Sequence, residues 1–198
     1  AQNLLRLNVP GHSADHAAAP ELMDFYGEDV VRKDISPLLT GVDLGPDNPF
    51  TRSLALAAEA WGARRTWFLT NGASQANRMG ALTFGAFRRI DQPILVQRSA
   101  HSSFIDGIIL AGLTPVFVQP VLDDRYGIAH GVAPAELERT LAHTEDPKGV
   151  YVVTPSYFGA VADVAALAEI AHSAGVPLMV DEAWGAHFGF HPQLPKNS

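Results

Sequence analysis

From Ser53 onward, the chain alternates short runs of β-branched and aromatic residues with longer stretches of helix-like pattern. The short runs are apolar almost throughout, as parallel strands buried on both faces are. Such alternation is typical of βαβ units, so the sequence predicts an α/β fold with a mostly parallel sheet flanked by helices. We predict strands at residues 66–70, 94–97, 116–118, 149–153 and 178–181, and helices at 53–61, 74–88, 102–111, 134–143 and 164–174.

The first fifty residues have a different character. Proline and glycine recur throughout them, for example in Pro10-Gly11 and Gly45-Pro46, and this density of helix and strand breakers prevents long regular elements. We therefore predict an extended N-terminal arm or linker over residues 1–52 and a major domain over residues 53–198. An arm of this kind needs a partner surface.

Charge and composition exclude several classes of function. The net charge is −7 and the 14 lysines and arginines are scattered, which argues against a nucleic-acid surface. No stretch approaches the roughly 18 consecutive apolar residues of a membrane span, and the first residues do not resemble a signal peptide. The absence of cysteine is compatible with a reducing compartment, so we expect a soluble cytoplasmic protein.

A glycine-containing turn follows the first predicted strand and opens a helix. Gly72 allows a tight turn, and the backbone amides of Ala73 and Ser74 would then point out of the helix N-terminus, where the helix dipole favours a phosphate. Ser74 as a simple helix cap explains the pattern equally well. The pattern also resembles the nucleophile elbow of α/β-hydrolases, with Ser74 as nucleophile and the remaining triad members drawn from Asp163 or Asp181 and His187 or His191.

Two further polar groups stand directly after predicted strands. His101 follows one strand and precedes a helix, and Asp181 ends an apolar strand. In parallel sheets ligands bind beyond the carboxyl ends of the strands, so both side chains are site candidates. A carboxylate at such a place is costly to bury unless it meets a cation or a protonated nitrogen. A structural role for His101 and a turn-capping role for Asp181 are the alternatives.

Metal and nucleotide chemistry have little support. The pairs His12/His16 and His187/His191 have the spacing of metal ligands on a helix. The first pair follows Pro10-Gly11, the second is interrupted by Gly189 and followed by Pro192, and neither has a convincing third ligand. The sequence contains neither of the common glycine-rich nucleotide motifs. We predict no metal site.

Taken in order, these segments resemble the major domain of the Orn/Lys/Arg decarboxylases, which belong to the type I (aspartate-aminotransferase-like) fold of enzymes that use pyridoxal 5′-phosphate (PLP). The resemblance covers nearly the whole chain. It rests on the segments VPGH (9–12), TGVDLG (40–45), NGASQAN (71–77), RSAHSS (98–103), GLTPV (112–116) and VDEAWGAHF (180–188).

The resemblance implies a role for each candidate residue. Ala73 and Ser74, after the turn at Gly72, would bind the PLP phosphate. His101 would stack on the pyridine ring and Asp181 would pair with the ring nitrogen, which keeps the ring able to accept electrons. Trp184 and His187 would line the same pocket, and His187 joins His101 and Asp181 as a predicted catalytic residue.

The chain also departs from the family pattern. Ala73 stands where the family often has threonine, and Trp184 where many members have histidine. The family's Schiff-base lysine follows a Ser-x-His-Lys motif that is missing here, and Lys33, Lys148 and Lys196 lie in unsuitable contexts. We therefore expect the chain to be a fragment that ends before the catalytic lysine and the family's C-terminal small domain, and to be inactive by itself.

The resemblance thus implies a PLP-dependent lyase that decarboxylates ornithine, lysine or arginine as a homodimer or higher homo-oligomer. Other PLP reactions remain open on the sequence alone. So do two alternatives, an α/β-hydrolase with Ser74 as nucleophile and a non-catalytic PLP-fold module that only dimerises.

Overall fold

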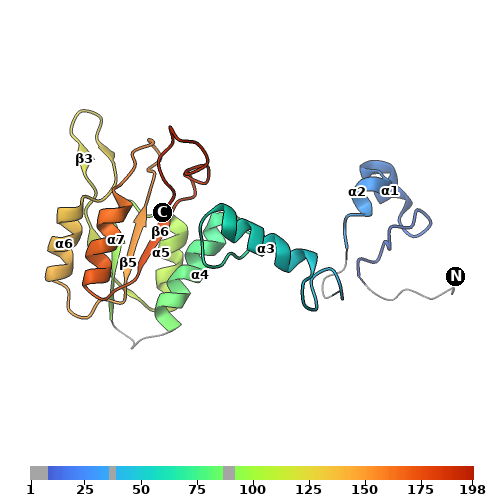
Figure 1. The fold of residues 1–198 in the computed structure, drawn as a ribbon, viewed down its shortest axis with the longest axis horizontal. Coiled ribbons are helices and arrows are strands. Elements are labelled where there is room, and N and C mark those ends of the chain that lie inside the picture. Colours follow the sequence, from blue (N-terminus) through green and yellow to red (C-terminus); the bar gives the residue numbers. More distant parts are fainter. Residues whose placement is uncertain (1–8, 36–38, 87–91) are drawn as a thin grey trace. The chain divides into compact units, whose positions relative to one another are not determined.

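The structure is a computed structural model that describes residues 9–35, 39–86 and 92–198. The chain forms two compact units, Ala1–Trp67 and Phe68–Ser198. Figure 1 shows the elements of each. Parts of the predicted arm (1–8 and 36–38) and the end of the helix predicted at 74–88 lie outside the described residues. No helix among the described residues is long and apolar enough to cross a membrane.

The first unit contains only helices among its described elements. They are α1 (Pro20–Tyr26), α2 (Glu28–Val31) and α3 (Pro49–Ala60). Helix α3 begins four residues before its predicted start, because the Asn48 side chain accepts a hydrogen bond from the Thr51 amide at 2.8 Å and Pro49 occupies the first helical turn. The predicted division into an arm or linker over residues 1–52 and a major domain over residues 53–198 stays a prediction.

The second unit is an α/β domain. Its four-stranded sheet has the order β2-β1-β5-β6, and every neighbouring pair is parallel. The elements in chain order are α4 (Gly72–Ala86), β1 (Pro93–Gln97), α5 (Ser102–Ala111), β2 (Thr114–Val118), β3 (Leu122–Asp123), β4 (Ile128–Ala129), α6 (Pro134–Ala142), β5 (Val150–Val153), α7 (Val164–Ser173) and β6 (Leu178–Asp181). The predicted α/β class with a mostly parallel sheet is confirmed.

Helices cover both faces of the sheet (Figure 1). Alternate residues of each strand point to opposite faces, so Leu95 packs with α6 and α7 while Ile94 and Val96 pack with α4 and α5. Both clusters contain fully buried side chains. Burial on both faces explains why the strands read as unbroken apolar runs in the sequence.

One predicted strand is wrong. Residues 66–70 form no strand, and Trp67 and Phe68 are largely exposed. An apolar run predicts burial, but a strand also needs a neighbour that supplies ladder hydrogen bonds. This segment does not join the sheet, whose strand order is β2-β1-β5-β6.

The structure also contains a short antiparallel hairpin, β3–β4, that was not predicted from the sequence. The side chain of Asp123 shapes its turn by accepting hydrogen bonds from the amides of Arg125 at 2.9 Å and Tyr126 at 2.8 Å. Gly127 then takes a positive φ of 64°. Strands of two residues leave too little alternation for a sequence pattern to detect.

The order of the strands places the functional edge of the domain. From β1 the chain crosses to β2 on one side and then to β5 on the other. Such a reversal opens a crevice beyond the carboxyl ends of the two central strands, where ligands of open α/β sheets bind. His101 follows β1 and Asp181 ends β6, so both predicted residues lie at this edge.

Candidate cofactor-binding site

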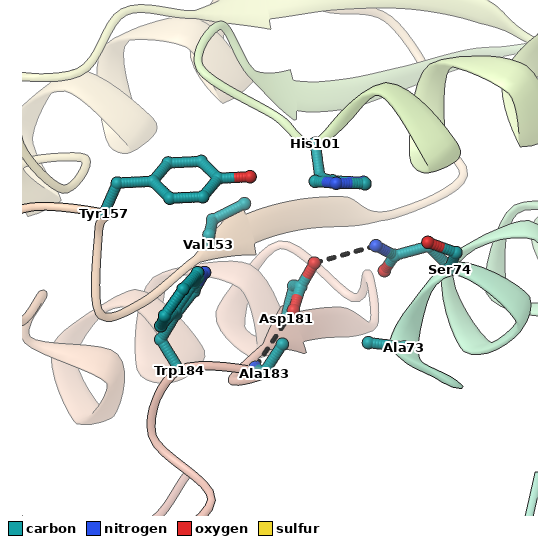
Figure 2. Close-up of a pocket in the computed structure, with 9 residues that line it drawn as sticks. Ala73, Ser74, His101, Val153, Tyr157, Asp181, Ala183 and Trp184 are labelled. Atoms are coloured by element: carbon teal, nitrogen blue, oxygen red, sulfur yellow. Dashed lines mark hydrogen bonds between the residues drawn. The ribbon is translucent and has the colours of Figure 1, made fainter. Parts of the chain in front are cut away.

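A cavity of about 310 Å³ lies at the carboxyl edge of the sheet. Figure 2 shows His101 on one side of it, Asp181 opposite, Ala73 and Ser74 at one end, and Tyr157 with Trp184 at the other. Asn77, Val153 and Ala183 complete the lining. This volume lies within the range of small-molecule and cofactor sites.

The first turn of α4 forms one end of the cavity. Gly72 takes a φ of +65°, a conformation that side chains other than glycine rarely adopt, and it turns the chain into the helix. Ala73 and Ser74 follow it and line the cavity, whereas Gly72 does not. The first amides of a helix have no partner within the helix, so this end of the cavity suits an anion.

Asp181 supplies the negative charge of the cavity. Its Oδ2 atom accepts hydrogen bonds from Asn77 Nδ2 at 2.8 Å and from the Tyr151 hydroxyl at 2.9 Å, and Oδ1 accepts one from the Ala183 amide at 3.1 Å. Donors from α4, β5 and the turn after β6 therefore fix a half-buried carboxylate in one orientation. A protonated ring nitrogen would be a suitable partner for it within the cavity.

Tyr151 lies in the core directly behind Asp181. Its ring is fully buried and stacks on Phe104 with 3.6 Å between ring centroids. Burial raises the pKa of the Tyr151 phenol well above its ordinary value, and the nearby Asp181 charge raises it further. The phenol therefore stays protonated and acts as a hydrogen-bond donor to the carboxylate.

His101 caps the N-terminus of α5. The Ser103 amide donates to its Nδ1 atom at 3.2 Å, and the Ser103 hydroxyl lies 2.7 Å from the same nitrogen. Because Nδ1 accepts the amide bond, the neutral imidazole has its proton on Nε2. The cap thus sets both the ring orientation and the tautomer of the imidazole.

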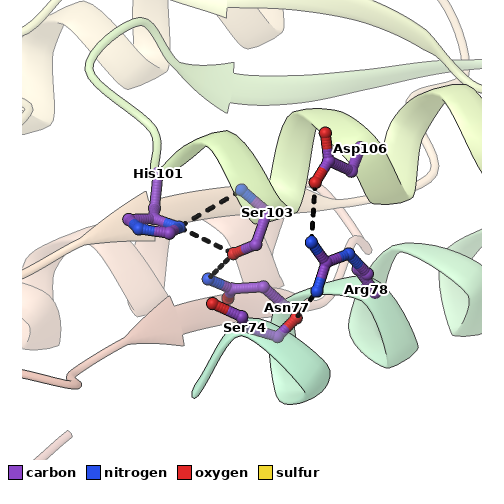
Figure 3. Close-up of polar contacts among 6 residues, drawn as sticks. All are labelled: Ser74, Asn77, Arg78, His101, Ser103 and Asp106. Carbon is purple, nitrogen blue, oxygen red and sulfur yellow. Dashed lines mark hydrogen bonds and ion pairs between the residues drawn. The ribbon is translucent and has the colours of Figure 1, made fainter. Parts of the chain in front are cut away.

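No role was predicted for Asn77, which lines the cavity and is nearly fully buried. Its Nδ2 atom donates to Ser103 Oγ at 3.0 Å (Figure 3) and to Asp181 Oδ2 at 2.8 Å. Asn77 therefore links Asp181 to the serine that holds His101. Its position three residues after Ser74 places both on one face of α4, which is a signal that could have found it.

Two large aromatic side chains form the other end of the cavity. Tyr157 and Trp184 meet edge to face with 5.6 Å between centroids, and each is 60% exposed. Trp184 lines the cavity as expected, and Tyr157 was missed. Tyr157 follows the carboxyl end of β5, so the strand-end rule that selected His101 would also have selected it.

His187 does not line the cavity. Its exposed ring packs against Phe188 with 5.0 Å between centroids. The structure therefore brings together Ala73, Ser74, His101, Asp181 and Trp184 and leaves Gly72 and His187 outside the lining. The roles assigned to all seven residues stay predictions.

The residues of the hydrolase alternative are not assembled into a triad. Among the described residues, no imidazole hydrogen bonds to the Ser74 hydroxyl. The Nδ1 atom of His191 accepts from the Gln193 amide at 3.2 Å, and Asp163 caps α7 by accepting from the Ala166 amide at 3.1 Å. Ser74 thus lacks the adjacent base that would activate it as a nucleophile.

The remaining candidate groups also lie outside the cavity. None of Lys33, Lys148 and Lys196 is among its lining residues. His12 pairs with Asp34 at 3.1 Å and His16 with Asp24 at 3.0 Å. Over the part of the chain that the structure describes, no group of three or more His, Cys, Asp or Glu side chains could hold a metal ion.

The donor set of the cavity fits PLP in three respects. The α4 N-terminus suits the phosphate, Asp181 suits a protonated pyridine nitrogen, and the His101 imidazole offers a flat face to an aromatic ring. The three groups stand at the start of α4, at the N-cap of α5 and at the end of β6. These elements belong to one compact unit, which fixes the distances among the groups.

Residues 2–198 match the family model described as Orn/Lys/Arg decarboxylase, major domain. The arginine decarboxylase of Bacillus subtilis is 35% identical over 192 residues, which cover 96% of this chain and 39% of the relative. The chain thus spans about two fifths of the length of that curated relative.

Solved structures show the same fold. The constitutive lysine decarboxylase of Escherichia coli superimposes with a TM-score of 0.74 at 22% identity, covering 96% of this chain and 28% of that one. The pyridoxal-5′-phosphate-dependent protein YhfS of Escherichia coli gives 0.53 at 22% identity, covering 73% and 38%. With the family match over almost every residue, the chain belongs to the Orn/Lys/Arg decarboxylase family, through its major domain.

Proposed function

We propose that the full-length protein decarboxylates a basic amino acid, arginine, lysine or ornithine, with PLP held in the cavity described above. The observation that supports the proposal most strongly is that one cavity is lined both by the first turn of α4 and by the Asp181 carboxylate. These two groups match the two ends of a phosphorylated pyridinium. The names of the related proteins support the reaction and the substrate class.

Each residue has a definite task in this proposal. The amides of Ala73 and Ser74, with the Ser74 hydroxyl, bind the phosphate and fix one end of the ring. His101 covers one ring face and keeps its orientation through its bonds to Ser103. Asp181 holds a proton at the pyridine nitrogen. When bound, PLP supplies the electron sink that stabilises the negative charge left as carbon dioxide departs.

Tyr157 and Trp184 are placed to receive the substrate. They stand at the end of the cavity opposite Ala73 and Ser74 (Figure 2), and each is 60% exposed. Aromatic rings attract cationic side chains, so this wall suits the ammonium or guanidinium group of a basic amino acid. We also propose that the protein works as a homo-oligomer.

The test uses the full-length protein, because the described chain spans only part of its relatives. Apo-protein is incubated with arginine, lysine or ornithine, with and without PLP, and the amine product is measured. We expect PLP-dependent product from one of the three. Asp181→Ala should lower kcat at least a hundredfold, because the ring nitrogen loses its charged partner, a change worth about 3 kcal/mol or more.

Asp163→Asn is the matched control. It also removes a carboxylate, but it lies at the start of α7, and asparagine caps a helix as well as aspartate does. Its activity should equal that of the wild-type protein. PLP-independent turnover, no turnover of any of the three amino acids, or full activity in Asp181→Ala would refute the proposal.

A further inference from the structure

Asn77 joins the two halves of the site through a single amide group. One Nδ2 contact reaches Ser103 Oγ at 3.0 Å, and Ser103 holds the His101 ring (Figure 3). The other reaches Asp181 Oδ2 at 2.8 Å. An amide nitrogen has two hydrogens, so both are used. The same side chain thus holds Asp181 directly and His101 through Ser103.

The direction of each hydrogen bond in this chain follows from the donors available. Tyr151 has one proton, and its hydroxyl lies 2.9 Å from Asp181 Oδ2 but 3.4 Å from Asn77 Oδ1, so the proton goes to the carboxylate. Asn77 must then present its nitrogen, not its oxygen, to Asp181. Ser103 Oγ, which accepts from Asn77, is left free to donate to His101 Nδ1.

Burial makes this arrangement costly to disturb. Asn77 is 3% exposed and Ser103 is 1% exposed, so the loss of a partner leaves a buried polar group unsatisfied. The backbones that place them approach closely: a Cβ at Gly107 of α5 would lie 2.7 Å from the Ala81 Cβ and 3.0 Å from the Arg78 Cα of α4. The helices therefore hold Asn77 within reach of Ser103.

We propose that Asn77 is the positioning residue of this site, which sets the His101 ring and the Asp181 carboxylate relative to each other before the cofactor binds. The proposal rests on the proposed function and adds a residue to it. Asn77 acts through its neighbours. If its two N–H donors are lost, the Asp181 carboxylate is free to rotate. Ser103 Oγ then also loses the hydrogen bond that it accepts from Asn77 and that orients its hydroxyl. Both changes weaken the fit to a flat, cationic ring.

The test measures PLP binding by full-length apo-protein, through the dissociation constant and the circular dichroism that the protein induces in the cofactor absorption band. Asn77→Leu keeps the side-chain size and removes both donors. We expect its dissociation constant to rise at least tenfold, since a bond to a charged group is worth about 1.5–3 kcal/mol, and the induced signal to fall. Ser103→Ala should reduce the induced signal with a smaller loss of affinity, and Ser103→Thr should restore it.

Two controls separate positioning from general stability. Ser102→Ala removes an exposed hydroxyl next to Ser103 and should bind PLP as the wild-type protein does. Thr140→Val removes a buried hydroxyl that donates to the Glu136 carbonyl in α6, away from the cavity, and should lower thermal stability without changing the induced signal.

The outcomes distinguish this inference from the function it rests on. If the wild-type protein does not bind PLP, the proposed function fails. If the wild-type protein binds PLP and both Asn77→Leu and Ser103→Ala match its dissociation constant and induced signal, the function stands and the positioning role is wrong. Should Asn77→Leu not fold, the Ser103→Ala and Ser103→Thr pair decides alone.

Discussion

The Asp181 carboxylate, which lines the cavity, depends on Tyr151, which does not. The phenol donates to the carboxylate from within the core, where its pKa is raised by burial and then by the charge of Asp181. The carboxylate therefore has a donor that holds its proton more tightly than an exposed phenol does. Its orientation should not change with pH through loss of this bond.

Tyr151→Phe tests this contact through the pH dependence of stability. The folded pKa of Tyr151 lies above its unfolded value near 10, so its stabilising contribution is fully present below about pH 10. Above that pH the unfolded chain loses the proton first, and the contribution falls by about 1.4 kcal/mol per pH unit. Urea midpoints at pH 8 and pH 11 should therefore show the wild-type advantage over Tyr151→Phe shrinking. An unchanged advantage at pH 11 would contradict the buried contact.

Whether a site residue could be predicted from the sequence depended on where it lies in the fold. His101 and Asp181 stand at strand ends, and the strand-end rule found them from the sequence. Asn77 and Tyr151 lie inside a helix and a strand, where periodic patterns report burial but not which polar groups meet. Their contacts join residues 74 and 104 positions apart, and only the folded chain brings these together.

At the scale of elements, the packing of α4 against α5 fixes the distance between Asn77 and Ser103. The two helices approach closely at Gly107, where an added Cβ would lie 2.7 Å from the Ala81 Cβ. The local sequence predicted both helices, and the bounds of α5 agree to the residue. What it could not predict is that this glycine sets the spacing, because that depends on which helix packs opposite.

Gly107→Ala tests this spacing. The added Cβ would meet the Ala81 Cβ and the Arg78 backbone, which cannot move without shifting α4. We expect overpacking, about 1–3 kcal/mol, to exceed the roughly 1 kcal/mol that alanine gains in helix propensity, so the thermal midpoint should fall by several degrees. Ile109→Ala, an exposed position on the same helix, should change it little. A midpoint for Gly107→Ala at or above the wild-type value would contradict the close packing.

The strands show where local pattern is enough and where it is not. Four predicted strands formed because each is apolar and each has a parallel neighbour. Residues 66–70 have the same composition and formed none, since a strand depends on a partner that the local sequence does not encode. The β3–β4 hairpin formed although it was not predicted, because its turn residues fix it without a long apolar run.

At the scale of the whole molecule, the sheet order explains why separate segments converge. The reversal between β1 and β5 opens one crevice at the carboxyl edge, and the turns after β1, β5 and β6 all reach it. The start of α4 closes the same crevice from the side. The α/β class and this edge were predictable from alternation alone, whereas the strand order needed the structure.

The proposed function requires that Asp181 and the first turn of α4 bind the two ends of a single phosphorylated pyridine. A crystal structure of the full-length protein with PLP tests it directly. We predict the ring nitrogen within hydrogen-bond distance of the Asp181 carboxylate, the phosphate at the amides of Ala73 and Ser74, and the His101 imidazole over one ring face. PLP bound elsewhere, or in this cavity with its phosphate away from α4, would contradict the account.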